Sequence, residues 1–276
     1  MAKIFESCEF VAWKRHGIIH MLEAVSNGNI RRLLDFARNI LCSSHLDTKK
    51  ILSRIEETGS YFIPDFEGVK TLLYGDYMHY DPSKSPFINM FDLRHAEPYE
   101  HFLRLSILHY LVKISPDGSS RGYVNVDEIL RYLTTLGYSY TPSLDTIKNL
   151  IEKHYVKKPV DTDSDLSENE RIRITSLGRY HIFSLVNVFQ YLDATIIDTP
   201  IIDEDIRQKI SDVPTINERI DRTKYFLNYL DNCSKSIQDK ELQSVWRNIS
   251  SEVKREITEI INRLEDNKRI NSDPKS

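Results

Sequence analysis

The sequence predicts a mainly α-helical protein with one small β-hairpin, and three observations lead to that prediction. Residues that favour helices are abundant, whereas the 276 residues include only 9 glycines and 10 prolines. Apolar residues recur every three or four positions along most of the chain, as they do on one face of a helix. Only Val156–Val160 and Arg171–Thr175 have the composition of β-strands.

Residues 1–72 are expected to form a helical bundle. A first helix is predicted over Phe10–Val25 and a third over Asp47–Thr58, with a turn at Ser26–Asn29 that is rich in helix N-cap residues. The second helix begins after this turn, and its predicted buried stripe consists of Ile30, Leu33, Leu34, Ala37, Ile40 and Leu41.

Residues 73–98 are expected to form an ordered linker. The tract Leu73–Asp92 is rich in aromatic residues and contains Gly75, Pro82 and Pro86, so it favours an irregular segment packed on its neighbours. An alternative is that some of these rings stack on nucleic-acid bases, and the residues in question are Tyr74, Tyr77, His79 and Tyr80.

Residues 99–198 follow the order of a winged helix and its exit helix. A helix over Tyr99–Ile114 precedes a β-like step at Gly122–Asn125, and a second helix runs from Val126 to Gly137. A third helix over Pro142–Tyr155 comes before the β-hairpin, and one long helix over Ser176–Ile196 follows it. A winged helix binds nucleic acid or protein surfaces and performs no chemistry itself.

Local signals define the ends of these helices. Asn125 and Glu128 have the spacing of a capping box, as do Thr215 and Glu218 further along the chain. Thr141 precedes Pro142, which suits the first position of a helix.

Residues 199–276 are expected to form a helical hairpin. Its longer helix, over Asp239–Asp266, has apolar residues at alternating spacings of three and four, as a seam against a partner helix requires. This hairpin is therefore the candidate surface for homo-oligomerisation, whereas the polar residues Asn267–Ser276 are expected to fray.

Composition limits the classes of function. The formal net charge is −4, so any surface attractive to nucleic acid would have to be local. The three cysteines have no zinc-binding spacing, and their odd number suits a reducing compartment. The sequence has neither an apolar run of membrane-spanning length nor a secretory leader pattern. We therefore expect a cytoplasmic protein with no membrane contact.

Motifs for catalysis are missing from the sequence. It contains no G-x-x-x-x-G-K-[ST], no G-x-G-x-x-G, no G-x-S-x-G and no H-E-x-x-H. His16 and His20 have the spacing of two ligands on one helix face, but no third ligand accompanies them. The prediction is a non-enzymatic protein with no catalytic residues, no metal and no cofactor.

The third helix of the winged helix contains the candidate nucleic-acid-binding residues. Between Ser143 and Lys158 four lysines outnumber two acids, and Ser143, Thr146, Asn149 and Lys153 are predicted to face outward. The candidate set is completed by Lys148, Lys157 and Lys158. The wing tip argues against DNA because its carboxylates would repel phosphates: Asp161, Asp163, Asp165, Glu168 and Glu170. A protein-contacting or architectural winged helix is therefore favoured, and a DNA-binding transcriptional regulator is the alternative.

A resemblance to a known family enters at the turn Ser26-Asn27-Gly28-Asn29-Ile30-Arg31-Arg32. This stretch resembles the sensor-2 start of the helical lid in AAA+ and STAND-type P-loop ATPases. The stretches Tyr74–Tyr77 and Ser85–Asp92 look like the junction between lid and winged helix in that family, and Tyr191–Ile201 looks like the family's stretch after the winged helix. The resemblance covers about residues 10–202.

The resemblance implies a helical lid and assigns nucleotide sensing to Arg31, with Arg32 as the second choice. The chain departs from the family because the nucleotide-binding core and its Walker motifs are missing, so hydrolysis does not carry over. The chain is then either the C-terminal part of a longer ATPase or a separate protein descended from one. The expected function is a non-catalytic interaction and regulatory module whose partner is another protein or its own ATPase core, with DNA as a further possible partner.

Overall fold

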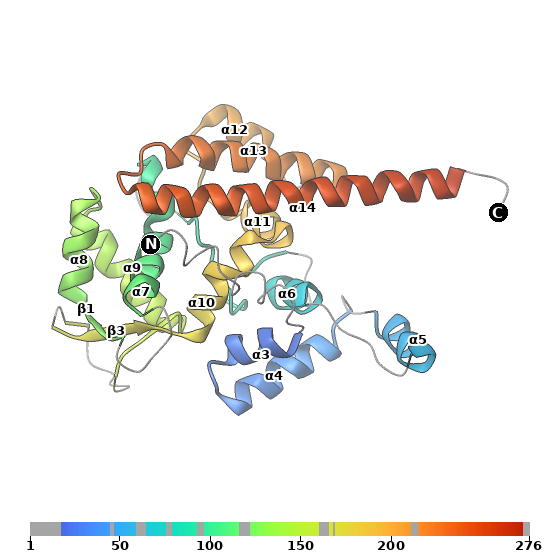
Figure 1. The fold of residues 1–276 in the computed structure, drawn as a ribbon, viewed down its shortest axis with the longest axis horizontal. Helices are drawn as coiled ribbons and strands as arrows, with labels where there is room; N and C mark the ends of the chain where they lie inside the picture. Colours follow the sequence, from blue (N-terminus) through green and yellow to red (C-terminus); the bar gives the residue numbers. More distant parts are fainter. Residues whose placement is uncertain are drawn as a thin grey trace.

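The computed structural model confirms the predicted class: the chain is mainly helical and has one small antiparallel sheet (Figure 1). It describes residues 18–44, 47–58, 65–75, 79–92, 97–115, 122–159, 166–167, 169–210 and 215–272. The apolar side chains of these residues form a continuous core that includes members from both ends of the described chain, Met21 and Ile257 among them.

The N-terminal helices are α3 (Ile18–Ser26), α4 (Ile30–Leu41), α5 (Thr48–Thr58) and α6 (Asp65–Tyr74). Helices α3, α4 and α6 contact one another, whereas α5 lies at the edge of the molecule (Figure 1). The predicted boundaries of the second and third helices are confirmed to within a residue, and the start predicted at Phe10 lies outside the described residues. Helix α6, which extends into the predicted linker, was not predicted, because Gly68 interrupts its short apolar pattern.

The turn between α3 and α4 fastens these helices to the rest of the protein. Asn27 has a positive φ of 52°, and its side chain donates to the carbonyl of His154 at 3.0 Å. The same side chain accepts the backbone N–H of Leu177 at 3.0 Å, and α3 packs on the helix that contains Leu177. Asn29 caps α4 by accepting the backbone N–H of Arg32 at 3.1 Å.

The region from residue 98 to residue 183 has its helices and strands in the predicted order. They are η1 (Pro98–Phe102), α7 (Leu103–Ile114), β1 (Val124–Asn125), α8 (Val126–Thr135), α9 (Tyr140–Glu152), β2 (Val156–Lys157), β3 (Arg171–Ile174) and α10 (Ser176–Phe183). Strand β3 is central and pairs antiparallel with both neighbours, in the order β1-β3-β2. Ile172 and Ile174 are buried on one face of β3, and Arg171 and Arg173 alternate with them.

Two predicted helix starts are corrected in this region. Helix α9 begins at Tyr140 with Ser139 at its N-cap, so Thr141 is not the cap. Asn125 does occupy the N-cap of α8, but its side chain makes no capping bond. The predicted capping box fails there because Glu128 accepts the hydroxyl of Tyr110 instead, at 2.9 Å.

The prediction of one long helix over Ser176–Ile196 is wrong. The segment is divided into α10, the short 3₁₀ helix η2 (Leu185–Asn187) and α11 (Phe189–Thr195). Side chains satisfy the backbone groups that the breaks expose. Asn187 donates to the carbonyl of Phe183 at 2.9 Å, and the carboxylate of Glu256 accepts the N–H of Phe189 at 2.7 Å. Glu256 is remote in sequence, so helix periodicity alone could not reveal the break.

The C-terminal part contains α12 (Glu204–Lys209), α13 (Ile216–Ser234) and α14 (Lys240–Ser272). The capping box of Thr215 and Glu218 is confirmed, and α12 was not predicted. Helices α13 and α14 lie side by side, and α14 extends past α13 (Figure 1). The predicted seam is confirmed by the burial of Trp246, Val253 and Ile257, but α14 continues beyond the predicted end at Asp266.

Candidate functional site

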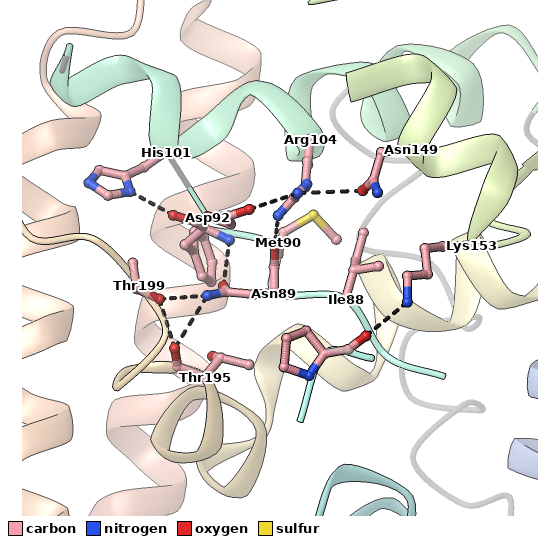
Figure 2. A network of polar contacts seen from close by, with 12 residues as sticks. Ile88, Asn89, Met90, Asp92, His101, Arg104, Asn149, Lys153, Thr195 and Thr199 are labelled. Atoms are coloured by element: carbon pink, nitrogen blue, oxygen red, sulfur yellow. Dashed lines mark hydrogen bonds and ion pairs between the residues drawn. The ribbon is translucent and has the colours of Figure 1, made fainter. Parts of the chain in front are cut away.

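The segment Ser85–Asp92 is largely buried and has no regular secondary structure (Figure 2). Side chains from remote elements satisfy its backbone. The hydroxyl of Tyr155 accepts the N–H of Ile88 at 3.2 Å. The hydroxyl of Tyr191 accepts the N–H of Met90 and donates to the carbonyl of Ile88, both at 2.8 Å. We call this stretch the central segment.

Asn89 and Arg104 fix the middle of the central segment (Figure 2). The amide of Asn89 donates to Thr199 Oγ1 at 2.8 Å, and its Oδ1 accepts the N–H of Phe91 at 3.0 Å. The guanidinium of Arg104 donates to the carbonyl of Asn89 and pairs with Asp92 at 2.9 Å. Both Asn89 and Arg104 are buried, so these bonds form where water cannot replace them.

Two buried histidines complete the network as neutral rings. His101 Nδ1 donates to the carbonyl of Phe91 at 2.7 Å, and its Nε2 accepts the hydroxyl of Tyr229 at 2.7 Å. His181 Nδ1 accepts the hydroxyl of Tyr155 at 2.6 Å. Burial lowers the pKa of His101 to about 4. Burial and the nearby charge of Arg104 lower the pKa of His181 to about 3.

The central segment therefore joins parts of the chain that lie far apart in sequence. Its bonding partners come from α7, the α9–β2 junction, α11 and the loop that follows α11, and His101 links it to α13. These polar groups bond to one another inside the core. The arrangement holds these regions of the chain together.

A second buried polar cluster joins α11 to α13. The carboxylate of Asp193 is 1% exposed and pairs with Arg219 and with Arg222, the latter at 2.6 Å. Arg219 also donates to the hydroxyl of Tyr74 on α6 at 3.2 Å. Because a buried carboxylate requires such partners, this cluster is a structural link between three helices.

The structure corrects the predicted outward face of α9. Ser143 and Thr146 are 1% and 5% exposed, so the prediction that they face outward is wrong. Asn149 lies beside Arg104, and Lys153 donates to the carbonyl of Pro82 at 2.8 Å (Figure 2). The periodicity located the helix, but it could not show that other parts of the chain, among them α7 and α8, pack against it.

The remaining candidate lysines do not form one surface with these residues. The exposed side of α9 contains Asp145 and Glu152, and Lys148 lies 4.0 Å from Asp145. Lys158 pairs with Glu170 at 3.3 Å, whereas Lys157 is exposed on β2. The other predicted wing-tip acids lie outside the described residues: Asp161, Asp163, Asp165 and Glu168.

The sheet has a basic face that was not predicted from the sequence. Lys157 pairs in register with Arg173, and Arg171 with Asn125, so these four side chains share the face opposite the buried isoleucines. The guanidinium of Arg173 lies 5.0 Å from the ring centroid of Tyr123. The alternation of arginine and isoleucine in β3 was visible in the sequence, whereas the strand pairing that adds Lys157 was not.

The two arginines of the family resemblance lie in different surroundings. Arg31 is exposed in the first turn of α4. Arg32 is half-buried, and its guanidinium lies 5.7 Å from the ring centroid of Phe36. Within the described part of the chain, the turn that precedes them binds His154 and Leu177 through Asn27.

The aromatic tract packs as the linker interpretation predicted, at the positions that the structure describes. Tyr80 is buried and donates to the carbonyl of Phe87 at 2.9 Å, and Tyr74 contacts Arg219. His79 is exposed, and Tyr77 and His16 lie outside the described residues. Over the described ranges, no group of histidine, cysteine and acidic side chains could hold a metal ion.

The predicted stripe of α4 is only partly buried. Ile40 is 1% exposed, but Ile30, Leu34 and Leu41 are 74%, 61% and 59% exposed. The prediction that these three lie in the core is wrong, because the chain covers only the side of α4 that carries Leu33, Phe36 and Ile40. Periodicity identifies an apolar face but does not say whether the same chain covers it. We call Ile30, Leu34, Ala37 and Leu41 the α4 stripe, in which Ala37 alone among the four packs partly against the core.

Comparisons with protein-family models, with curated proteins and with solved structures each found no match to this chain. None of the helices built from described residues is both long enough and apolar enough to cross a membrane.

Proposed function

We propose that this chain is a non-catalytic interaction and regulatory module, in which residues 99–183 form a winged helix that contacts protein rather than DNA. The order of helices and strands around β3 supports the fold assignment. One observation carries the functional part: the exposed side of α9 presents Asp145 and Glu152 beside Lys148, so with Lys153 at its C-terminal end this side has no excess of positive charge. Such a surface does not attract a phosphate backbone.

A P-loop ATPase, as a separate subunit or as part of a longer chain, is the partner class that the family resemblance suggests. Of the two arginines that the resemblance singles out, Arg31 is the one that can face this partner, because it is exposed in the first turn of α4 and makes no ion pair within the described residues. Arg32 is less suited, since its guanidinium already lies over Phe36.

A gel-shift assay with duplex DNA across a range of salt concentrations tests the proposal. We expect no retained complex even at low salt. A complex that weakens steeply with salt would overturn it, because ion pairs with phosphates give that dependence. Replacing Lys148, Lys153, Lys157 and Lys158 together would then show whether α9 and β2 make the contact.

The basic face of the sheet favours one second candidate, a nucleic-acid-binding regulator that uses its sheet instead of α9. Arg171, Arg173 and Lys157 would contact phosphates there, and Asn125 completes the face. The double variant Arg171→Glu with Arg173→Glu distinguishes this candidate. It should abolish any gel shift that the quadruple lysine variant only weakens.

A further inference from the structure

We propose that the α4 stripe is a docking site for a helix of another protein, and that this helix has acidic residues beside its own apolar stripe. This inference rests on the proposed role as an interaction module and names the surface and the chemistry of its partner.

The α4 stripe has the geometry of a helix-binding surface. Its members succeed one another at spacings of four, three and four residues, so they lie in one row on a helix of 12 residues. Three of them expose more than half of their side-chain area to solvent, at 74%, 61% and 59%. Removing an exposed isoleucine or leucine from water is favourable, so a partner that covers the row gains free energy from each of them.

The fold already holds α4 in position in the absence of a partner. Helix α4 is capped by Asn29 and anchored by the buried side chain of Ile40. The turn before it is bonded to His154 and Leu177 through Asn27. A helix that is held in this way loses little conformational entropy when it binds.

The charges beside the α4 stripe determine the kind of helix that fits. Arg31 and Arg38 are seven residues apart, nearly two turns, so both lie along the same edge of the row. Both are exposed, and neither forms an ion pair with any described residue; α4 has one acidic residue, Asp35, against three arginines, so its open side remains basic. The opposite edge faces Ile40 and is covered by the chain. A docked helix therefore meets two cations on its open side, which favours glutamate or aspartate there.

A second copy of this chain fits less well. Two antiparallel α4 stripes in register would pair Ile30 of one copy with Leu41 of the other. The same register brings Arg31 of one copy next to Arg38 of the other, and like charges at such positions are destabilising. The two arginines thus argue against self-association and for a partner of opposite charge.

Binding of two fluorescently labelled synthetic peptides to the full chain tests the proposal. One is an amphipathic helix with leucines at spacings of three and four and glutamates beside them, and its twin carries lysines in place of the glutamates. We expect the glutamate peptide to bind about tenfold more tightly than the lysine peptide, since the two arginines attract the glutamates and repel the lysines. Anisotropy titrations measure this ratio.

Variants of α4 make the test specific. Arg31→Glu with Arg38→Glu should reverse the preference between the peptides, and Leu34→Ser should weaken binding of the glutamate peptide at least tenfold. Ile216→Ser, an exposed isoleucine on α13, is the matched control and should leave binding unchanged. Equal affinity for both peptides, or binding that Leu34→Ser does not weaken, would overturn the proposal.

If the α4 stripe binds something other than an acidic helix, the experiments give different results. Dimerisation in sedimentation experiments that Leu34→Ser abolishes would assign the α4 stripe to a second copy and overturn the proposal. Binding of the glutamate peptide only after removal of residues 1–17 would assign it to the chain's own N-terminus, and adsorption to anionic vesicles that Leu34→Ser abolishes would assign it to a lipid surface. Either result also overturns it. A negative result in the peptide titrations does not change the expected result of the gel-shift assay. The further inference and the proposed function can therefore be refuted independently.

Discussion

The central segment and the α4 stripe differ in whether the chain itself supplies the contacts that their groups require. Along Ser85–Asp92, polar backbone groups lie in the core, and side chains from remote elements bond to them. Along α4, apolar side chains lie in water although a buried core is close by. The backbone groups of the central segment find hydrogen-bond partners within the chain, whereas most apolar side chains of the α4 stripe are not covered by it.

This difference separates residues that maintain the fold from residues that are free to bind. Buried polar networks are costly when one member is lost, so the central segment should tolerate little change. Exposed apolar side chains contribute little to folding, so the α4 stripe should tolerate substitution without loss of stability. A substitution in each region therefore tests the assignment of both.

The largest expected effect is that of Arg104→Ala. The substitution leaves the buried carbonyl of Asn89 and the partly buried carboxylate of Asp92 without their cation, and such a loss costs about 3–5 kcal/mol. Urea denaturation at pH 7.5 measures the change. Arg131→Ala is the matched control, because its side chain is 80% exposed and pairs only with Asp127 across one helical turn. It should cost less than about 0.5 kcal/mol. Similar losses in the two variants would contradict a special role for the central segment.

Acid should destabilise the protein through the same network. The pKa of His101 is lowered to about 4 and that of His181 to about 3, from an ordinary value of 6.5. The unfolded chain therefore binds more protons than the folded one below pH 6.5. The free energy of unfolding should be flat above that pH and fall by about 1.4 kcal/mol per histidine per pH unit below it, towards pH 4.

Urea titrations at pH 7.5, 6.0 and 5.0 measure this slope. His101→Gln removes one titrating ring and retains a donor for the carbonyl of Phe91, so it should reduce the slope by about 1.4 kcal/mol per pH unit. An unchanged slope in this variant would show that His101 is protonated in the folded protein.

Two substitutions on α4 compare its covered and open sides directly. Ile40→Ala removes a fully buried side chain and should cost about 2–4 kcal/mol. Leu34→Ala removes a side chain that is 61% exposed and should cost less than about 0.5 kcal/mol. Thermal unfolding of the two variants measures the difference. A cost above about 2 kcal/mol for Leu34→Ala would mean that the α4 stripe belongs to the fold.

Sequence patterns predicted most helices because their signals are local. The spacing of apolar residues located α4, α7, α8, α13 and α14, and the capping box at Thr215 located the start of α13. The break after Phe183 was not predicted, because it depends on Glu256, which is distant in sequence. Local patterns could not show that contact.

The site predictions failed for a related reason. Ser143 and Thr146 look like outward residues of a recognition helix, but burial depends on what packs against α9. Conversely, Ile30 and Leu34 look like core residues, and nothing in their own spacing says that the chain leaves them uncovered. The central segment had only one sequence signal, an aromatic-rich tract too apolar for a mobile linker. Its partners Tyr155, Tyr191 and His181 could be identified only from the folded structure.

The smallest effect in this series concerns the turn that positions α4. Asn27→Ala removes two hydrogen bonds, to His154 and from Leu177, and places alanine at a positive φ, so it should cost about 1–2 kcal/mol. Asn27→Gly removes the same bonds but tolerates the backbone conformation, so it should cost less than Asn27→Ala. If the turn also holds the α4 stripe in its binding geometry, both variants should weaken the glutamate peptide while remaining folded at room temperature. Unchanged peptide affinity would mean that α4 is held by its buried side alone.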